Sequence, residues 1–338
     1  GWMIAFMFEP ATSLLGFTEL GSWLTDFSLA RNIGFSALFI LLTVLIISAG
    51  VEQGIEKWSS RLMPSLFALL FGLILYVLTQ DGAVEGLKHY LVPDFSQMTN
   101  PKLIVSAMGQ AFFSMSLGVG TMLIYGSYIR KDENLPVVGA LVTLTDTSVA
   151  FLAGLLVLPA IFVAQNLGVT IYAESGSLIA GPDLIFQVLP ALFEGMGAAG
   201  VFVGLAFFVL MSIAAVTSSI SMLEVPVSYA VEARQINRTK ATWLVALIIF
   251  AVSTTIALNF DSLFGFVITL TTERAQPLLS MFICIFAGWI FHRNSILAEI
   301  QKGNPDVEQS LFWTIWPLYV KLFCPVLILL TFAQGFMS

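Results

Sequence analysis

Charged side chains are scarce in this sequence. Lys, Arg, Asp and Glu make up 10% of the 338 residues, hydrophobic residues make up 58%, and the mean hydropathy is +0.92. A soluble globular chain carries about 25% charged residues. The composition therefore excludes a soluble domain and indicates an all-α polytopic membrane protein. Its expected surroundings are a lipid bilayer, and no nucleic-acid partner is expected.

Cysteine and histidine are also rare, with two residues of each type. Cys284 and Cys324 lie in apolar stretches, and His89 and His292 lie in loops far apart in sequence. This pattern indicates neither a disulfide framework nor a metal site built on cysteine or histidine. We find no nucleophile paired with a base in the sequence, so an enzyme is not expected.

Long apolar runs are what the sequence has in abundance. A membrane-spanning helix needs about 20 mostly apolar residues. Eight complete spans are expected, preceded by a partial span at about 1–18 that we interpret as a chain entering in the middle of a helix. The apolar stretch at about 180–193 contains two prolines and an aspartate and predicts an extracellular loop helix. The eight spans are at about 33–51, 62–80, 104–128, 136–166, 198–223, 241–260, 263–291 and 311–336.

Lysine and arginine predict the orientation, because they favour cytoplasmic loops. Alternate loops hold nine of them against three, so the loops after 51, 128, 232 and 291 are expected in the cytoplasm and the C-terminus outside it. No linker or charge run divides residues 1–338, which predicts a single transmembrane domain in the cell (inner) membrane. The nine are Lys57, Arg61, Arg130, Lys131, Arg234, Arg238, Lys240, Arg293 and Lys302, and the three are Arg31, Lys88 and Lys102.

The span at 104–128 is weakened at its centre. The segment "FFSMSLGVGTMLIYGSY" places Ser114, Ser116, Gly118, Gly120 and Thr121 where a plain anchor would have Leu, Ile or Val. Glycine in a helix interior costs about 1 kcal/mol relative to alanine. Backbone groups freed by a break cannot face lipid but can face a cavity, as in secondary transporters. The segment therefore predicts a broken helix at a binding site, or alternatively a close contact between helices.

A second polar segment, "SIAAVTSSISMLEVPV", covers 212–227. Ala214, Thr217, Ser221 and Glu224 recur at helical spacing and share one face, flanked by Ser218 and Met222. Hydroxyl and carbonyl oxygens are hard ligands suited to a hard cation, here sodium. The alternative is that the hydroxyls bond back to carbonyls of their own helix.

Asp146 is a lone carboxylate inside the span at 136–166. Such residues face the protein interior and mark ion or substrate paths. The alternative is a structural carboxylate bonded to the neighbouring Thr143, Thr145 and Thr147.

Three motifs resemble the neurotransmitter:sodium symporter family, in particular its bacterial amino-acid transporters. They are "SLGVGTMLIYGSYIRKDEN" (116–134), "AVTSSISMLEVP" (215–226) and "GIEKWSSRLMP" (54–64). The resemblance implies the LeuT-type inverted-repeat bundle. It places this chain from the end of the third helix through the eleventh, lacking the first two and a half helices and the sodium and substrate ligands they carry.

The resemblance also implies roles for individual residues. Ser114 and Asp146 would contribute to one sodium site, and Asp146 resembles the chloride-independent members, so no chloride requirement is expected. Ala214, through its carbonyl, and Thr217 and Ser218 would form a second sodium site. Phe113 would cover the substrate, while Ser116, Val119, Ser218 and Met222 would line its pocket. Tyr128 and Glu232 would form the cytoplasmic gate, with Gly118, Gly120, Gly54 and Pro64 as hinge positions. The outer gate stays unassigned, because Ile268 stands where an acidic residue is expected.

The sequence and the resemblance together predict sodium-coupled symport of an apolar or aromatic amino acid by alternating access. The alternative is a truncated, transport-inactive homologue with a structural or sensory role in the membrane. The amino acid, the sodium stoichiometry and the oligomeric state are left open.

Overall fold

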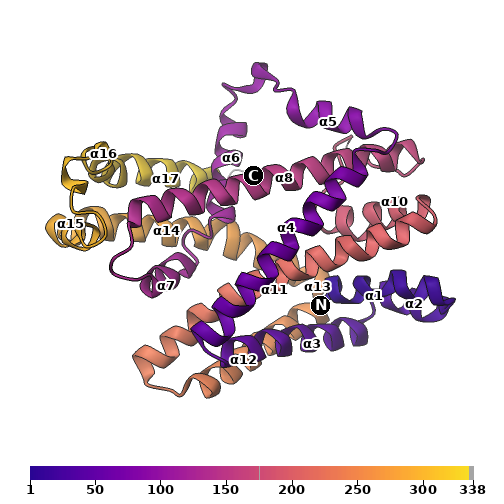
Figure 1. Ribbon diagram of the computed structural model, residues 1–338, viewed down its shortest axis with the longest axis horizontal. Coiled ribbons are helices and arrows are strands. Elements are labelled where there is room, and N and C mark those ends of the chain that lie inside the picture. The colour runs from indigo at the N-terminus through magenta and orange to yellow at the C-terminus, as the bar shows by residue number, and fades with distance from the viewer. Residues whose placement is uncertain (175, 335–338) are drawn as a thin grey trace. The chain divides into compact units, whose positions relative to one another are not determined.

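The computed structural model describes residues 1–174 and 176–334, and they form helices joined by mostly short loops (Figure 1). No strand is present among the described residues, apart from an isolated antiparallel bridge between Tyr172 and Leu178. The all-α architecture expected from the composition is confirmed.

The helices belong to two compact units, whose boundary falls inside one helix, α8 (Leu135–Asn166). Unit 1 comprises residues 1–93 and 149–258, and unit 2 comprises residues 94–148 and 259–338. Unit 1 holds α1 (Trp2–Leu15), α2 (Thr18–Thr25), α3 (Leu29–Ser48), η1 (Val51–Glu56), α4 (Lys57–Val77), α5 (Ala83–Leu91), α9 (Gly181–Asp183), η3 (Leu184–Val188), α10 (Leu189–Gly195), α11 (Ala198–Arg234) and α12 (Arg238–Leu258). Unit 2 holds η2 (Phe95–Gln97), α6 (Pro101–Ser114), α7 (Thr121–Tyr128), α13 (Phe260–Ile268), η4 (Thr269–Ala275), α14 (Gln276–Ile285), η5 (Phe286–Ile290), α15 (Arg293–Gln301), η6 (Val307–Gln309), α16 (Leu311–Leu318), η7 (Tyr319–Phe323) and α17 (Cys324–Gln334).

Six helices in the described part of the chain are long and apolar enough to cross a membrane, or seven if a bent pair counts as one span. Eight spans were expected, and two of them account for the difference between eight and six. The stretch at 104–128 is divided into α6 and α7, each shorter than a span, and 260–290 passes only together with α15, at a bend of 97°. The last two residues of the expected span 311–336 lie outside the described residues. The partial span at 1–18 is the helix α1, of 14 residues.

The stretch at 180–193 is helical, as expected, and runs through α9, η3 and α10 from Gly181 to Gly195. The two predicted hinge positions Gly54 and Pro64 both lie in helical segments in this structure. Gly54 lies in the wider π-helical turn η1, and Pro64 lies inside α4. Gly54 is buried, and a Cβ atom there would lie 2.0 Å from the carbonyl oxygen of Ile46, so only glycine fits beside the end of α3.

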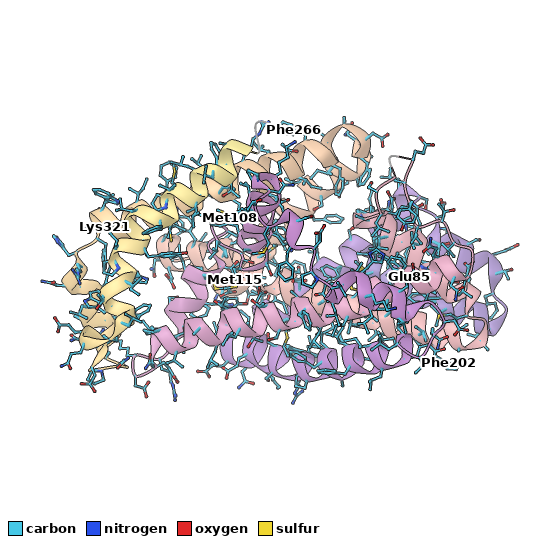
Figure 2. All side chains as sticks on the ribbon, turned by 90° about the horizontal axis from the view of Figure 1, so that it is seen from above. Glu85, Met108, Met115, Phe202, Phe266 and Lys321 are labelled. Carbon is cyan, nitrogen blue, oxygen red and sulfur yellow. The ribbon has the colours of Figure 1, made fainter. Side chains whose placement is uncertain are left out.

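The core of unit 1 is an apolar cluster formed mainly by α1, α4, α8, η3, α10 and α11. Phe6, Phe186 and Phe208 meet there, with ring centroids 5.0 to 6.4 Å apart. In both units, many large apolar side chains remain exposed. Phe202 of unit 1 is 65% exposed and Phe266 of unit 2 is 59% exposed, and both point outward (Figure 2). Soluble monomers rarely expose apolar surface on this scale, whereas a lipid environment favours it.

Candidate functional site

The chain breaks its helical path between α6 and α7, as the serines and glycines predict. Residues 115–120 leave the α-helix, and Ser116, Gly118 and Gly120 have positive φ angles of 50°, 82° and 93°. Glycine adopts such angles at little steric cost. The break therefore lies within the segment that the sequence singles out.

A glutamine from α14 supports this break from the side. The Gln276 side-chain amide donates a hydrogen bond to the carbonyl of Phe112 at 3.0 Å, and Gln276 is only 6% exposed. A Cβ atom on Gly118 would lie 2.2 Å from the Gln276 carbonyl oxygen. Both interpretations of the glycines, a helix break and a close contact between helices, therefore apply to this segment, because the broken segment also packs closely on α14.

Ser114 and Asp146 meet beside the break. The Ser114 hydroxyl, at the last residue of α6, donates to Asp146 Oδ2 on α8 at 2.7 Å. The hydroxyls of Thr143 and Thr147 donate instead to the carbonyls of Gly139 and Thr143, one turn earlier in α8. These two threonines therefore do not bind the Asp146 carboxylate, and its described partner is the serine predicted to share a sodium site with it.

The second predicted set lies on α11, in unit 1. The Thr217 hydroxyl is buried and donates to the carbonyls of Ile213 and Ala214, at 3.1 and 2.9 Å. The Ser221 hydroxyl donates to the carbonyl of Thr217 at 3.1 Å. Bonding back to the same helix, the alternative weighed from the sequence, is what these two hydroxyls do here.

Ser218 and Met222 are exposed and line a cavity of about 480 Å³ within unit 1. On the same wall, the hydroxyls of Thr43 and Ser219 lie 3.0 Å apart and join α3 to α11. This cavity therefore adjoins the predicted sodium ligands of α11.

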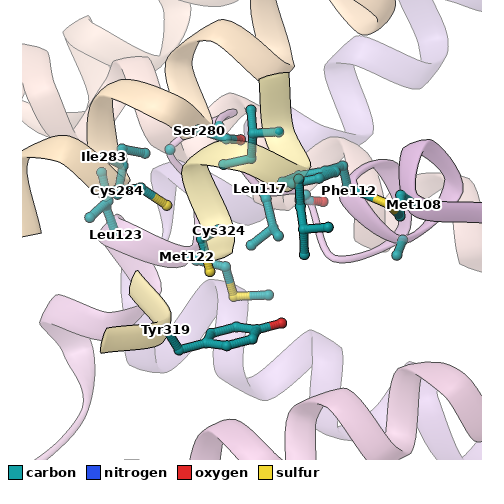
Figure 3. A pocket seen from close by; sticks show the side chains of 16 residues that line it. Met108, Phe112, Leu117, Met122, Leu123, Ser280, Ile283, Cys284, Tyr319 and Cys324 are labelled. Carbon is teal, nitrogen blue, oxygen red and sulfur yellow. The ribbon is translucent and has the colours of Figure 1, made fainter. Parts of the chain in front are cut away.

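The other predicted substrate residues belong to unit 2. Phe113 is 52% exposed and Val119 is 36% exposed. Ser116 lines a cavity of about 450 Å³ formed by α6, α7, α14 and α17 (Figure 3). The predicted substrate residues are thus divided between the two units.

The predicted gate residues lie at helix ends. The Tyr128 ring, at the end of α7, packs edge-on against Tyr125 with centroids 6.2 Å apart. In the loop that follows, the Arg130 guanidinium bonds to Glu133 at 2.7 Å, and this bond together with the charge of Asp132 raises the pKa of Arg130. Glu232, near the end of α11, is exposed.

Sequence reasoning missed the ion pair between Glu224 and Arg238. Glu224 on α11 is fully buried, and Arg238 Nη2 lies 2.6 Å from its Oε2. Arg238 Nε also donates to the carbonyl of Ile47 at 3.0 Å, so this residue joins α12 to α11 and to the end of α3. A carboxylate within an apolar span was the available signal for a partner, since such groups are paired when buried. Sequence reasoning also missed the role of Gln276. The signal there was a single side-chain amide within an expected span.

Comparison with known proteins places the chain in a family. The model of the Sodium:neurotransmitter symporter family matches residues 28–338. The uncharacterized sodium-dependent transporter YhdH of Bacillus subtilis is 32% identical over 98% of this chain and 74% of its own length. An uncharacterized sodium-dependent transporter of Haemophilus influenzae is 31% identical over 99% of this chain and 74% of its own length.

A solved structure agrees with the sequence comparisons. The crystal structure of MhsT in complex with L-phenylalanine matches with a TM-score of 0.78 and 32% identity, covering 99% of this chain and 79% of that one. This match confirms the LeuT-type fold, and membership of a transporter family confirms that the protein is not an enzyme. The chain belongs to the sodium:neurotransmitter symporter family, whose members are sodium-dependent membrane transporters.

Proposed function

We propose that this protein carries an apolar or aromatic amino acid across the cell (inner) membrane together with sodium, by alternating access and without a chloride requirement. Its C-terminus lies outside the cytoplasm in this proposal, as the distribution of lysine and arginine indicates. Sodium and the amino acid are both cargo, and sodium moving down its gradient drives the uptake.

The hydrogen bond from Ser114 to Asp146 carries this proposal. It brings a hydroxyl and a carboxylate together at 2.7 Å, directly before the helix break. Hard oxygen ligands bind hard cations, and broken helices are where secondary transporters bind their coupling ions. The Asp146 carboxylate supplies a negative charge that complements sodium, so a separate bound chloride is not needed.

The α11 residues support a second cation position. The carbonyl of Ala214 and the hydroxyls of Thr217 and Ser218 are oxygen donors on consecutive turns of one helix. Thr217 would offer an oxygen lone pair to the ion, while its O–H continues to donate to a carbonyl of the helix. Each sodium that moves inward gains about 2.3 kcal/mol per 100 mV of membrane potential.

The substrate class follows from the apolar residues around the break and on α11. Val119 is small and Met222 is long and adaptable, which leaves room for a large apolar side chain. The structural relative MhsT, which was solved with L-phenylalanine, supports an aromatic amino acid as the first substrate to test.

The experiment is uptake of radiolabelled phenylalanine by proteoliposomes that contain the full-length protein. We expect uptake to require an inward sodium gradient and to continue when chloride is replaced by gluconate. Asp146→Ala should reduce sodium-dependent uptake at least about tenfold, the scale of losing about 1.4 kcal/mol of ion binding. Asp306→Asn, in an exposed loop, is the control that should leave uptake unchanged.

Undiminished sodium-dependent uptake by Asp146→Ala would remove the assigned role of this carboxylate. If the wild-type protein takes up none of the amino acids in a broad panel, the alternative of a transport-inactive homologue with a structural or sensory role is favoured instead.

A further inference from the structure

Four sulfur atoms gather around the cavity of unit 2. Met108 of α6, Met122 of α7, Cys284 of α14 and Cys324 of α17 all line it (Figure 3). Most of the remaining wall is apolar, with Ser116, Ser280 and Tyr319 as its hydroxyl-bearing residues among those described. A wall of this composition offers soft ligands and few hard ones.

The two cysteines act as a pair in this arrangement. Both line the same cavity from two adjoining helices, and both are free cysteines. They are 40 residues apart in sequence, and the packing of α14 against α17 brings them together. The sequence alone gives no reason to expect these two residues beside one cavity.

We propose that Cys284 and Cys324 bind one soft monovalent metal ion, copper(I) or silver(I), with the Met122 thioether as an additional neighbour. Thiolate and thioether sulfurs select soft ions of this kind over hard ones. Sodium is a poor occupant, because it prefers hard oxygen ligands and most of this cavity wall is apolar or carries sulfur. This cavity site uses none of the oxygen ligands proposed for sodium.

The charge balance favours a monovalent ion. One thiol releases its proton to solvent and donates a sulfur lone pair as thiolate, while the second sulfur donates a lone pair without further change. The ion brings one positive charge and the thiolate one negative charge, so the complex is neutral and no electron is transferred. A neutral complex is favoured in an apolar cavity, where an unpaired charge is costly.

Two ligands on different helices also give the site a structural consequence. An ion held by Cys284 and Cys324 joins α14 to α17. Residues 116–118, in the helix break, lie on the same cavity wall. Binding would therefore stabilise the contact between these helices beside the break. This inference goes beyond the proposed transport function and does not depend on it.

The test uses silver(I) and the purified full-length protein in detergent, with glutathione present as a competing thiol. Bound silver per chain is measured by mass spectrometry after gel filtration. Thiols are counted by maleimide labelling before and after silver is added. We expect one silver ion per chain and the protection of both Cys284 and Cys324 by that single ion.

Single variants test whether the two thiols act together. Cys284→Ser and Cys324→Ser should each weaken silver binding at least about 100-fold, because the second thiol acts at a high effective concentration. Cys284→Ala and Cys324→Ala replace them where a serine variant elutes as aggregate. Met122→Leu should weaken binding less than either cysteine variant does.

Binding of two silver ions per chain, or protection of only one thiol, would overturn the proposal, and both are read from the wild-type protein alone. A single-cysteine variant that retains wild-type affinity would overturn it as well.

Discussion

The hydrogen bond from Gln276 to the helix break predicts that a chemically similar residue is tolerated less well at this position than a dissimilar one. The amide of Gln276 donates to the Phe112 carbonyl at 3.0 Å from a nearly fully buried position. Asparagine retains the amide but is one methylene shorter, whereas leucine retains most of the volume but has no donor. We predict that Gln276→Asn is more damaging than Gln276→Leu.

The expected loss of stability in each variant depends on which polar groups keep a hydrogen-bond partner. The Phe112 carbonyl also accepts from the backbone N–H of Leu117 at 3.0 Å, so it is not left unpaired in either variant. Gln276→Leu therefore loses one hydrogen bond, a net contribution of about 1 kcal/mol. Gln276→Asn loses the same bond and also leaves a buried amide without it, which costs about 1–3 kcal/mol more.

The assay is thermal unfolding of the purified protein, followed by its elution on size-exclusion chromatography. We expect Tm to decrease by roughly 2–4 °C for Gln276→Leu and by roughly two to four times as much for Gln276→Asn. Gln309→Asn, at the exposed end of the short helix η6, is the matched control, and its effect should be within about 0.5 kcal/mol of zero. If Gln276→Asn is as stable as the wild type, or more stable than Gln276→Leu, the amide does not support the break.

Two further predictions concern contacts within unit 1. Gly154→Ala would place its Cβ atom 2.2 Å from the Tyr90 ring and displace the Tyr90 hydroxyl, which donates to the Phe151 carbonyl at 3.1 Å. We expect a loss of about 1 kcal/mol that is smaller in a Tyr90→Phe background, measured as a double-mutant cycle of Tm. Arg238→Gln should destabilise by about 3–5 kcal/mol, because it removes the positive charge from beside the fully buried Glu224 carboxylate. The double variant with Glu224→Gln should recover much of that loss, and a purely additive result would contradict the pairing.

Apolar run length predicts the spans well wherever a helix is uninterrupted. The expected 136–166 is α8, Leu135–Asn166, and the expected 241–260 is α12, Arg238–Leu258. The expected 198–223 ends too early, since α11 continues to Arg234. Its last turns carry polar side chains as well as Pro226, so hydropathy decreases while the helical backbone continues. Hydropathy reports a preference for lipid, and a helix can extend beyond the residues that have that preference.

The candidate site was predictable in part. Glycine and serine in a span locate the break, because the conformational requirement is local to those residues. The residues that stabilise it are not local, since Gln276 follows Phe112 by 164 positions. Likewise, helical spacing places Thr217 on one face of α11, but it does not decide whether its hydroxyl bonds to the helix or faces outward. Partner choice depends on packing, which a single sequence does not contain.

Different atoms of the break contact the supporting helix α14 and the proposed sodium site. On one side, the Phe112 carbonyl and the Gly118 backbone are fitted to Gln276 on α14. On the other, the Ser114 hydroxyl meets the Asp146 carboxylate on α8. Changes at position 276 should therefore alter thermal stability before they alter sodium dependence. Changes at position 146 should do the reverse, because the carboxylate holds no backbone group of the break. The broken helix thus remains stable because a separate helix, α14, donates a hydrogen bond to its interrupted backbone.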